Sequence, residues 1–326
     1  MNDEKTSCFH RRLLFRGAAA GAAVPMLSAA PGAATTPRRT ESRTGSRTGK
    51  ASGAEFRWLG TTGWRIDFDG RTVLSDPYLT RFKTGLFEGS FNARTELETD
   101  EALVGEHIGR PELVLVSHSH WDHFNDVPFI ARSTEARIVG TETTYHLLRA
   151  FGIDTSRMIV VKGGEVLDFG GYVVEVVSSR HSRNKAQSYF APGTLNAPPA
   201  ARPETISDLP EGDTLAFQVT VGDGPSAFLM GASDFSARDA EGLRPDVAMV
   251  AVPNSVSTHR YVPRLLKTLG YPGTVVPVHW DVFENPLKDG PQEDPTMDLA
   301  GFRDQVRAAA PGTRILLPDY LTPYRF

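Results

Sequence analysis

The chain contains one segment in which a short apolar run leads directly into a dense group of metal-ligating side chains, Leu113-Val114-Leu115-Val116-Ser117-His118-Ser119-His120-Trp121-Asp122-His123. A short, continuous apolar run predicts a strand that is buried on both faces. Because α/β folds place their sites at the carboxyl ends of strands, we expect the side chains that follow to form a site. Imidazole nitrogens and carboxylate oxygens are ligands that suit Zn²⁺. The segment therefore predicts a metal site, and a histidine-rich solvent loop is the weaker interpretation.

The four ligands of this segment divide into two pairs. His118 and His120 alternate along the chain and can converge on one point, whereas Asp122 and His123 can reach a second point nearby. Four ligands in one loop cannot complete two metal sites, so further ligands must come from other strand ends. Three candidates each follow a predicted apolar strand: His181, Asp234 and His279. A lone histidine after a strand is as often structural as functional, but together the three are expected to meet at one rim.

The rest of the chain alternates short apolar runs with turns and a few amphipathic segments. The predicted strands are residues 56–59, 64–68, 72–74, 113–117, 138–139, 159–161, 166–167, 172–177, 215–221, 227–230, 247–252, 274–278 and 315–317. The predicted helices are residues 142–150, 261–269 and 299–309. Hairpin turns are expected at Asp69-Gly70 and across residues 222–224. Two strand-rich halves that each close with helices predict an α/β protein built as a four-layer αβ/βα sandwich. The Pro- and Ala-rich residues 188–209 are expected to form an insertion or a loop over one face.

The N-terminus has the pattern of an export signal over residues 1–34. Arg11 and Arg12 precede an Ala- and Gly-rich apolar run that is too short to span a membrane and ends in small residues at Ala34. The arginine pair followed by Leu-Leu-Phe favours a twin-arginine signal; an ordinary secretory signal or an uncleaved anchor is the alternative. We therefore expect a secreted, extracytoplasmic protein that engages the twin-arginine export machinery. Residues 35–53, rich in Thr, Arg, Ser and Gly, predict a disordered linker before a folded domain at 54–326.

The charge and cysteine content exclude some partners and ligands. The 326 residues carry a formal net charge of −4, but residues 1–34 and 35–50 carry +2 and +4, which leaves −10 on residues 51–326. A body this acidic repels a phosphate backbone, so nucleic acid is not expected as a partner. Bound divalent cations could still attract an anionic substrate, because they would dominate the local field. The only cysteine, Cys8, lies in the expected export signal, so any metal must be held by nitrogen and oxygen.

The pattern His-x-His-x-Asp-His at residues 118–123 resembles the metallo-β-lactamase superfamily, and the likeness extends over residues 55–326. Further blocks that resemble this superfamily, in the same order, are residues 58–60, 74–77, 113–124, 177–182, 228–234 and 276–281. The resemblance implies a first metal held by His118, His120 and His181, and a second held by Asp122, His123 and His279, with Asp234 bridging both. The Leu-Gly, Asp-Pro and Val-Pro-x-His blocks are most similar to the branch that includes L-ascorbate-6-phosphate lactonase and N-acyl-phosphatidylethanolamine phospholipase D.

The chain departs from that branch at two positions. Ser233 stands where the branch usually has glycine before the bridging aspartate, and Thr61 stands where it often has histidine after Leu-Gly. We expect the first difference to be harmless and the second to alter contacts with the substrate. His120 favours hydrolysis over redox chemistry, since oxygen-reducing di-iron relatives tend to carry glutamate there. Asp76 is expected to support a ligating histidine, and the alternative is an aspartate that caps the turn before Pro77.

The expected chemistry follows from the ligand set. Two divalent metal ions, Zn²⁺ in preference, can share a bridging hydroxide when they lie about 3.5–4 Å apart, because coordination lowers the pKa of water toward roughly 7. We therefore expect a hydrolase that cleaves a phosphodiester, lactone or amide in a small-molecule or lipid-like substrate. Asp122 would orient the hydroxide and take up a proton during turnover. The alternative function is a metal-binding protein without turnover that binds a partner.

Several further residues are candidates for substrate binding. Trp121, Tyr78 and Trp280 lie beside proposed ligands and could form the wall of an apolar pocket, although core packing explains each of them equally well. His259 and Arg260 follow a strand, and they could bind an anionic group, with His259 donating a proton in catalysis. The alternative for this segment is that it only caps the following helix.

Overall fold

The computed structural model describes residues 53–326. The expected export signal at 1–34 and nearly all of the linker at 35–53 lie outside the described residues. Among the described residues, none of the helices combines the length and the apolar character that crossing a membrane requires.

The first sheet has seven strands in the order β15-β1-β2-β3-β4-β5-β6. Their bounds are β1 (Glu55–Gly60), β2 (Gly63–Phe68), β3 (Arg71–Ser75), β4 (Leu113–Leu115), β5 (Arg137–Gly140), β6 (Met158–Val160) and β15 (Pro323–Tyr324). Strands β3 to β6 are parallel, and β15, β1 and β2 extend the sheet in antiparallel fashion. The β2–β3 turn forms as predicted, since Asp69 and Gly70 both take the positive φ values that a two-residue hairpin of type I′ requires.

The second sheet has the order β11-β8-β9-β10-β12-β13-β14, with β7 paired to β8. Its strands are β7 (Val166–Asp168), β8 (Tyr172–Arg180), β9 (Leu215–Val221), β10 (Ser226–Met230), β11 (Asp234–Phe235), β12 (Val247–Ala251), β13 (Thr274–Val278) and β14 (Arg314–Ile315). Because β9 is antiparallel to both β8 and β10, and β12 and β13 are parallel to β10, the strands β8, β10, β12 and β13 all run in the same direction.

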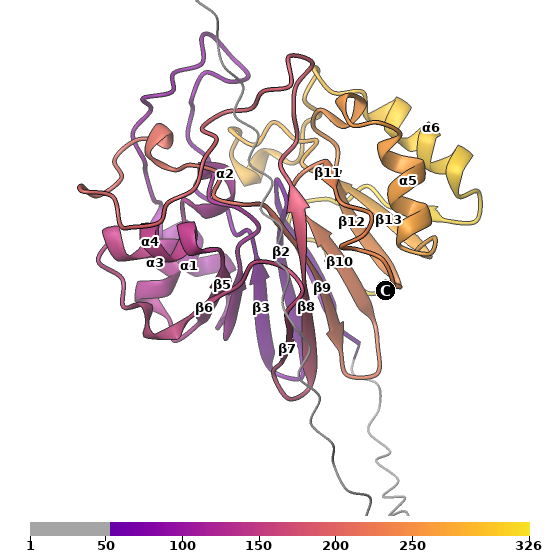
Figure 1. The fold of residues 1–326 in the computed structure, drawn as a ribbon, viewed down its shortest axis with the longest axis horizontal. Coiled ribbons are helices and arrows are strands. Elements are labelled where there is room, and N and C mark those ends of the chain that lie inside the picture. The colour runs from indigo at the N-terminus through magenta and orange to yellow at the C-terminus, as the bar shows by residue number, and fades with distance from the viewer. Residues whose placement is uncertain (1–52) are drawn as a thin grey trace, which may run out of the picture. The chain divides into compact units, whose positions relative to one another are not determined.

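Helices cover the outer face of each sheet (Figure 1). On the first sheet lie α1 (Glu101–His107), α3 (Val127–Ser133) and α4 (Glu142–Ala150), and on the second lie α5 (Tyr261–Thr268) and α6 (Leu299–Ala309). A one-turn helix, α2 (Trp121–Phe124), follows β4, and 3₁₀ turns occur at Thr155–Arg157, Ile206–Asp208, Ser255–Ser257 and Leu287–Asp289. The helix–sheet–sheet–helix arrangement confirms the predicted four-layer αβ/βα sandwich.

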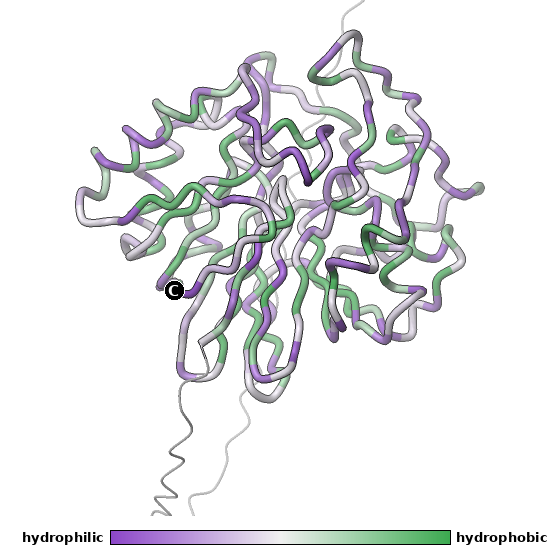
Figure 2. The backbone as a smooth tube through the Cα atoms, turned by 180° about the vertical axis from the view of Figure 1, so that it is seen from behind, coloured by the Kyte–Doolittle hydropathy of each residue, from purple (hydrophilic) through white to green (hydrophobic). Residues whose placement is uncertain are grey.

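The apolar residues of both sheets form one continuous core. In Figure 2 the central strands carry green stretches, whereas the helices at the flanks alternate between green and purple. Large side chains from both sheets, among them Trp58, Trp64, Tyr172 and Phe217, are almost completely buried. All three residues of β4 are buried, as the continuous apolar run predicts for a strand in the middle of a sheet.

The predicted and observed elements agree best where the apolar pattern is long. Helices α4 and α6 and strand β13 have the predicted bounds. Helices α1 and α3 and strands β11 and β15 were not predicted. In α1 only Val104 is buried, so its amphipathic signal is weak, and in α3 a proline stands in the first turn. Both sheets direct the carboxyl ends of their parallel strands toward one edge, and this edge carries the predicted ligands.

Candidate metal centre

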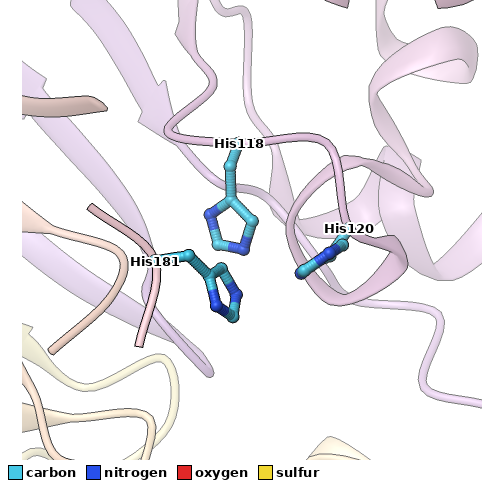
Figure 3. Close-up of side chains that lie close together, drawn as sticks. All are labelled: His118, His120 and His181. Carbon is cyan, nitrogen blue, oxygen red and sulfur yellow. The ribbon is translucent and has the colours of Figure 1, made fainter. Parts of the chain in front are cut away.

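Six of the predicted ligands form two compact groups. One group is His118, His120 and His181, and the other is Asp122, His123 and His279; within each group the potential ligand atoms lie within 4.8 Å of one another. Figure 3 shows the three imidazoles of the first group pointing toward a common centre. The groups are adjacent, because the ring centroids of His118 and His123 are 3.9 Å apart. This grouping is the one that the sequence resemblance implied.

The backbone after β4 explains how one segment supplies both groups. Residues 116–120 leave the strand without regular secondary structure, and His120 has extended backbone angles (φ −60°, ψ 155°) as the N-cap of α2. Asp122 and His123 then lie in the single turn of α2, so their side chains leave the chain in a different direction. Each group is completed by a residue of the second half of the chain. His181 follows β8, and His279 follows β13 with φ +60°.

Hydrogen bonds fix the orientation of the imidazoles and leave other ring nitrogens free. His181 Nδ1 donates to the Ser182 carbonyl oxygen at 2.7 Å, and His118 Nδ1 lies 3.1 Å from Ser117 Oγ. His118 Nε2 and His279 Nδ1 are buried, and neither has a hydrogen-bond partner among residues 53–326. A buried polar atom without a partner is costly unless something absent from the protein chain binds it. The nitrogen and oxygen donors of the two groups therefore fit a pair of divalent metal ions.

The Asp76 carboxylate supports His123 from behind. His123 Nδ1 donates to Asp76 Oδ2 at 3.0 Å, which directs Nε2 toward Asp122. The same carboxylate accepts from the Ser117 amide at 2.7 Å, the Ser117 hydroxyl at 2.5 Å and the Thr62 hydroxyl at 2.9 Å. Asp76 is the residue after β3, and β3 pairs in parallel with β4, so Asp76 lies beside the segment that begins at Ser117. This contact is the one that the predicted supporting role requires.

Burial and neighbouring charges set the protonation of the groups. Burial, followed by the adjacent imidazoles, lowers the pKa of His118 well below its usual value, and burial beside His181 lowers the pKa of His120 to about 3. Burial alone would raise the pKa of Asp122, but the neighbouring imidazoles of His123, His279 and His120 together outweigh it and the pKa falls. Burial opposes a charge on His123, yet the carboxylates around it raise its pKa. The first group is thus uncharged, as metal-binding imidazoles must be, and the second contains an ionised carboxylate.

Asp234 lies outside both groups, which corrects the bridging role expected for it. Its Oδ1 accepts a hydrogen bond from the amide of Phe235 at 2.7 Å and lies 3.8 Å from Arg264 Nη2 on α5. The physical reason is the connection between β10 and β11. Three residues separate the end of β10 from Asp234, which then pairs with Arg180 of β8 in antiparallel register. The carboxylate therefore faces α5 instead of the histidines.

Directly after β10 the chain lines the metal centre with a glycine, three residues before Asp234. Gly231 lines the site, and a Cβ added to it would lie 2.2 Å from Ser117 Oγ. The position has no room for a side chain unless Ser117 moves. The next residue, Ala232, is buried and has no ligand atom. Within the described part of the chain, the centre thus consists of six ligands from two groups.

A cavity of about 610 Å³ opens over both groups. Trp121 is part of its wall, as predicted, although only 5% of this residue is exposed. Five more large apolar residues of the wall were not predicted: Leu86, Phe87, Phe91, Phe190 and Phe283. Phe190 belongs to the segment expected to cover one face. The signal for Leu86, Phe87 and Phe91 was a set of large apolar residues in a stretch with neither strand nor helix periodicity.

Four other predicted site residues do not line this cavity. Trp280 stacks on Trp58 with ring centroids 5.4 Å apart, and Tyr78 is fully buried against Phe283. Both belong to the core, since Trp280 is 6% exposed and Tyr78 is fully buried.

His259 and Arg260 are exposed. The 3₁₀ turn Ser255–Ser257 faces the cavity instead, and the chain then turns away into α5 at Arg260, which has φ +46°. The structure therefore gives no support to the catalytic role expected for His259 or to the substrate contact expected for Arg260.

Comparison with known proteins agrees with the geometry. The family model of the β-lactamase superfamily domain matches residues 55–279. A UPF0173 metal-dependent hydrolase from Polynucleobacter asymbioticus is 25% identical over 243 residues, which cover 72% of this chain and 76% of that protein.

Two solved structures share the fold. A metallo hydrolase from the archaeon Ignicoccus hospitalis covers 84% of this chain and 98% of its own length, with a TM-score of 0.52 and 16% identity. A diiron β-hydroxylase from Streptomyces venezuelae has a TM-score of 0.54 and 13% identity, and the match covers 85% of this chain and 55% of that protein. At such identities the structural likeness concerns the fold alone. The match over 55–279 shows that the chain belongs to the β-lactamase superfamily.

Proposed function

We propose that this protein is a hydrolase that works with two divalent metal ions, of which Zn²⁺ suits the ligands best. His118, His120 and His181 would hold one ion, and Asp122, His123 and His279 would hold the other. The observation that carries the proposal is the pair of ligand groups with buried, unpartnered nitrogens. The chain is a metal-dependent hydrolase of the β-lactamase superfamily, in agreement with the names of its relatives.

The chemistry divides between the ions and the protein. When bound, two such ions lower the pKa of water toward roughly 7 and polarise the oxygen of the substrate. Asp122, which lines the cavity and is held ionised, accepts a proton from the attacking water and passes it to the leaving group. The water oxygen forms a bond to the carbonyl carbon or phosphorus, and the bond to the leaving oxygen or nitrogen breaks. Asp76 keeps His123 in the orientation that this geometry needs.

The substrate and the location of the protein are further parts of the proposal. The sequence resemblance to the lactonase and phospholipase D branch supports a lactone, phosphodiester or amide as the scissile group in a small-molecule or lipid-like substrate. Arg11-Arg12 and the apolar run after them support export through the twin-arginine machinery. Replacing both arginines with lysine is expected to keep the protein in the cytoplasm in a fractionation experiment, whereas unchanged export would indicate an ordinary secretory signal.

One observation favours a second candidate, a metal-binding protein without turnover. No carboxylate among residues 53–326 bridges the two groups, because Asp234 faces Arg264. An enzyme and a metal-binding module differ in their response to metal loading. The module would bind metal in stoichiometric amounts and hydrolyse none of a broad set of lactone, ester, amide and phosphodiester probes.

The deciding experiment combines metal analysis with this probe set on the full chain. We expect two metal ions per chain and metal-dependent hydrolysis of at least one probe class. His118→Ala removes a ligand of the first group and should lower the metal content to about one ion and the hydrolysis rate by at least about 100-fold. His107→Ala, at the half-buried end of α1, is the matched control and should change neither. Full metal content and full activity in His118→Ala would refute the proposal.

A further inference from the structure

Six apolar residues form a continuous wall, which we name the aromatic trough, on one side of the cavity over the ligand groups: Leu86, Phe87, Phe91, Trp121, Phe190 and Phe283. Phe190 lies edge-to-face against both Phe91 and Trp121, with ring centroids 5.3 Å apart in each pair. Phe87 packs in the same way against Phe283 at 4.9 Å, and Trp121 lies 6.4 Å from Phe283. The five aromatic residues of the trough are therefore one surface, and Leu86, the residue before Phe87, lines the same cavity.

The trough reaches both ligand groups. The ring of Phe190 lies 5.9 Å from that of His120, which belongs to the first group. The ring of Phe283 lies 5.2 Å from that of His279, which belongs to the second. A substrate whose scissile bond lies between the two groups therefore places its neighbouring atoms directly on the trough.

The outer part of the trough is exposed. Leu86 is 46% exposed and Phe91 is 40% exposed, and Val256, which lines the same cavity, is 66% exposed. Single exposed apolar residues are common on protein surfaces, but adjoining ones around a concave site mark a place where apolar surface is covered by a ligand. These side chains are not needed for the core of the sandwich. Their position is explained by an apolar part of the substrate.

The charges around the cavity argue against an anionic substrate. Apart from the histidines, Lys185 is the only cationic side chain among the described residues that line it, and no arginine does so. Asp294 and Asp298 also line the cavity. Their carboxylates cap neighbouring backbone, since Asp294 accepts from the Thr296 amide and Asp298 from that of Gly301. Beyond the metal ions, an anionic phosphodiester would meet more negative than positive charge.

On the basis of the function proposed above, we infer that the substrate is an uncharged acyl compound, a lactone, ester or amide, whose apolar substituent lies on the aromatic trough. A cavity of about 610 Å³ accommodates a substituent of several carbon atoms beside the scissile group. In the reaction, the oxygen of water bonds to the acyl carbon and the bond from that carbon to the leaving oxygen or nitrogen breaks. The leaving atom takes a proton, and the products are a carboxylic acid and an alcohol or amine.

The test measures how hydrolysis depends on chain length. The full chain, loaded with Zn²⁺, is given γ-lactones with alkyl substituents of two to ten carbons and, for comparison, bis(4-nitrophenyl) phosphate. We expect kcat/KM to rise about three- to fourfold per added methylene until the trough is filled, the factor that corresponds to about 0.8 kcal/mol per buried CH₂. The phosphodiester should be hydrolysed more slowly than the longer lactones.

Variants connect this dependence to the trough. Phe91→Ala and Phe190→Ala should flatten the rise of kcat/KM with chain length, with the largest loss for the longest lactone. Both residues lie outside regular secondary structure and are exposed or half-buried, so the fold should tolerate their loss. Tyr271→Ala is the matched control, because it removes an aromatic side chain that is 52% exposed and does not line the cavity. Tyr271→Ala should keep the full rise of kcat/KM with chain length.

Calorimetric binding of the straight-chain carboxylates from butanoate to decanoate separates this inference from the proposed function. Carboxylate affinity that rises with chain length and falls in Phe190→Ala supports the binding role of the trough. If no probe is hydrolysed in the same experiments, only the proposed hydrolase activity is contradicted. Hydrolysis with no dependence on chain length, or a preference for the phosphodiester, would overturn the inference about the substrate. The proposed hydrolase function would be unaffected by that result. Affinity independent of chain length would also overturn it.

Discussion

Replacing Asp76 with asparagine tests whether the carboxylate behind His123 orients a metal ligand. Asp76 is 1% exposed and accepts from four donors. Its Oδ1 accepts from the Ser117 amide, and its Oδ2 accepts from the hydroxyls of Ser117 and Thr62 and from His123 Nδ1. Asparagine has nearly the same shape but one acceptor oxygen, so its NH₂ group must replace one of the two carboxylate oxygens.

The geometry determines which oxygen is replaced and what this costs. An NH₂ group at the Oδ2 position would oppose three donors, whereas at the Oδ1 position it opposes only the Ser117 amide. The side chain should take the second orientation, which leaves one buried donor unpaired and costs about 1–3 kcal/mol of unfolding free energy. His123 then donates to a neutral oxygen instead of a carboxylate. Loss of such a partner typically lowers metal affinity by about 10- to 100-fold.

Two measurements on Asp76→Asn check these values. Competition with a chelating dye gives the affinity for each metal ion, and urea unfolding of the metal-free protein gives the stability. Asp69→Asn, in the exposed β2–β3 turn, is the matched control and should change neither. Metal affinities within twofold of the unchanged protein would show that Asp76 only holds the turn together, and the supporting role assigned to it would be wrong.

Three other substitutions test separate parts of the structure. Asp234→Asn should leave both metal stoichiometry and affinity within about twofold in the dye assay, since the carboxylate faces Arg264; loss of one ion would reinstate the bridging role. Glu112→Gln should destabilise the protein by about 1 kcal/mol at pH 7 in urea unfolding, because Glu112 is partly solvated but bonded to Arg71 by two nitrogens. Burial opposes the charge, yet the hydrogen bonds from Arg71 and Tyr172 and the charges of Arg71 and Arg137 together outweigh it and lower the pKa of Glu112 below its unfolded value of 4.5. The stabilisation is therefore complete above that value and lost as the pH falls through the folded pKa, so the difference in stability between the two proteins should shrink as the pH falls below 4.5. Asp281→Asn should cost about 3–5 kcal/mol in the same assay, because it leaves the buried guanidinium of Arg81 without its counter-charge at 3.2 Å; a cost below about 1 kcal/mol would contradict this.

The ligands could be predicted where a nearby buried strand determines the direction in which their side chains point. His118 to His123 follow a strand whose burial is clear from three consecutive apolar residues, and the spacing within the segment separates its two pairs. His279 comes directly after β13, so its position follows from the strand itself. In each case a few residues of regular backbone connect the buried strand to the ligand.

The site residues that were assigned wrongly or missed share a different cause. Asp234 comes after a three-residue connection whose path depends on pairing with β8, a strand more than fifty positions earlier in the chain. Trp280 is next to a ligand in sequence, but its side chain packs on Trp58 in the core. Phe190 has no strand or helix around it, so only the fold of the loop brings it to the cavity. Sequence patterns indicate burial and local direction, and the path of a loop depends on distant contacts.

The origin of the ligands also links metal binding to the assembly of the whole sandwich. Each ligand group combines residues that follow the first sheet with one that follows the second: His181 after β8 in one group and His279 after β13 in the other. Neither sheet can complete a group alone, so the metal sites exist only when the two sheets are packed together. Metal ions that bind the folded chain and not the unfolded chain stabilise it, by about 2.7 kcal/mol at a concentration 100 times the Kd. The ions proposed for the chemistry would therefore also hold together the edge of the two sheets that carries both ligand groups.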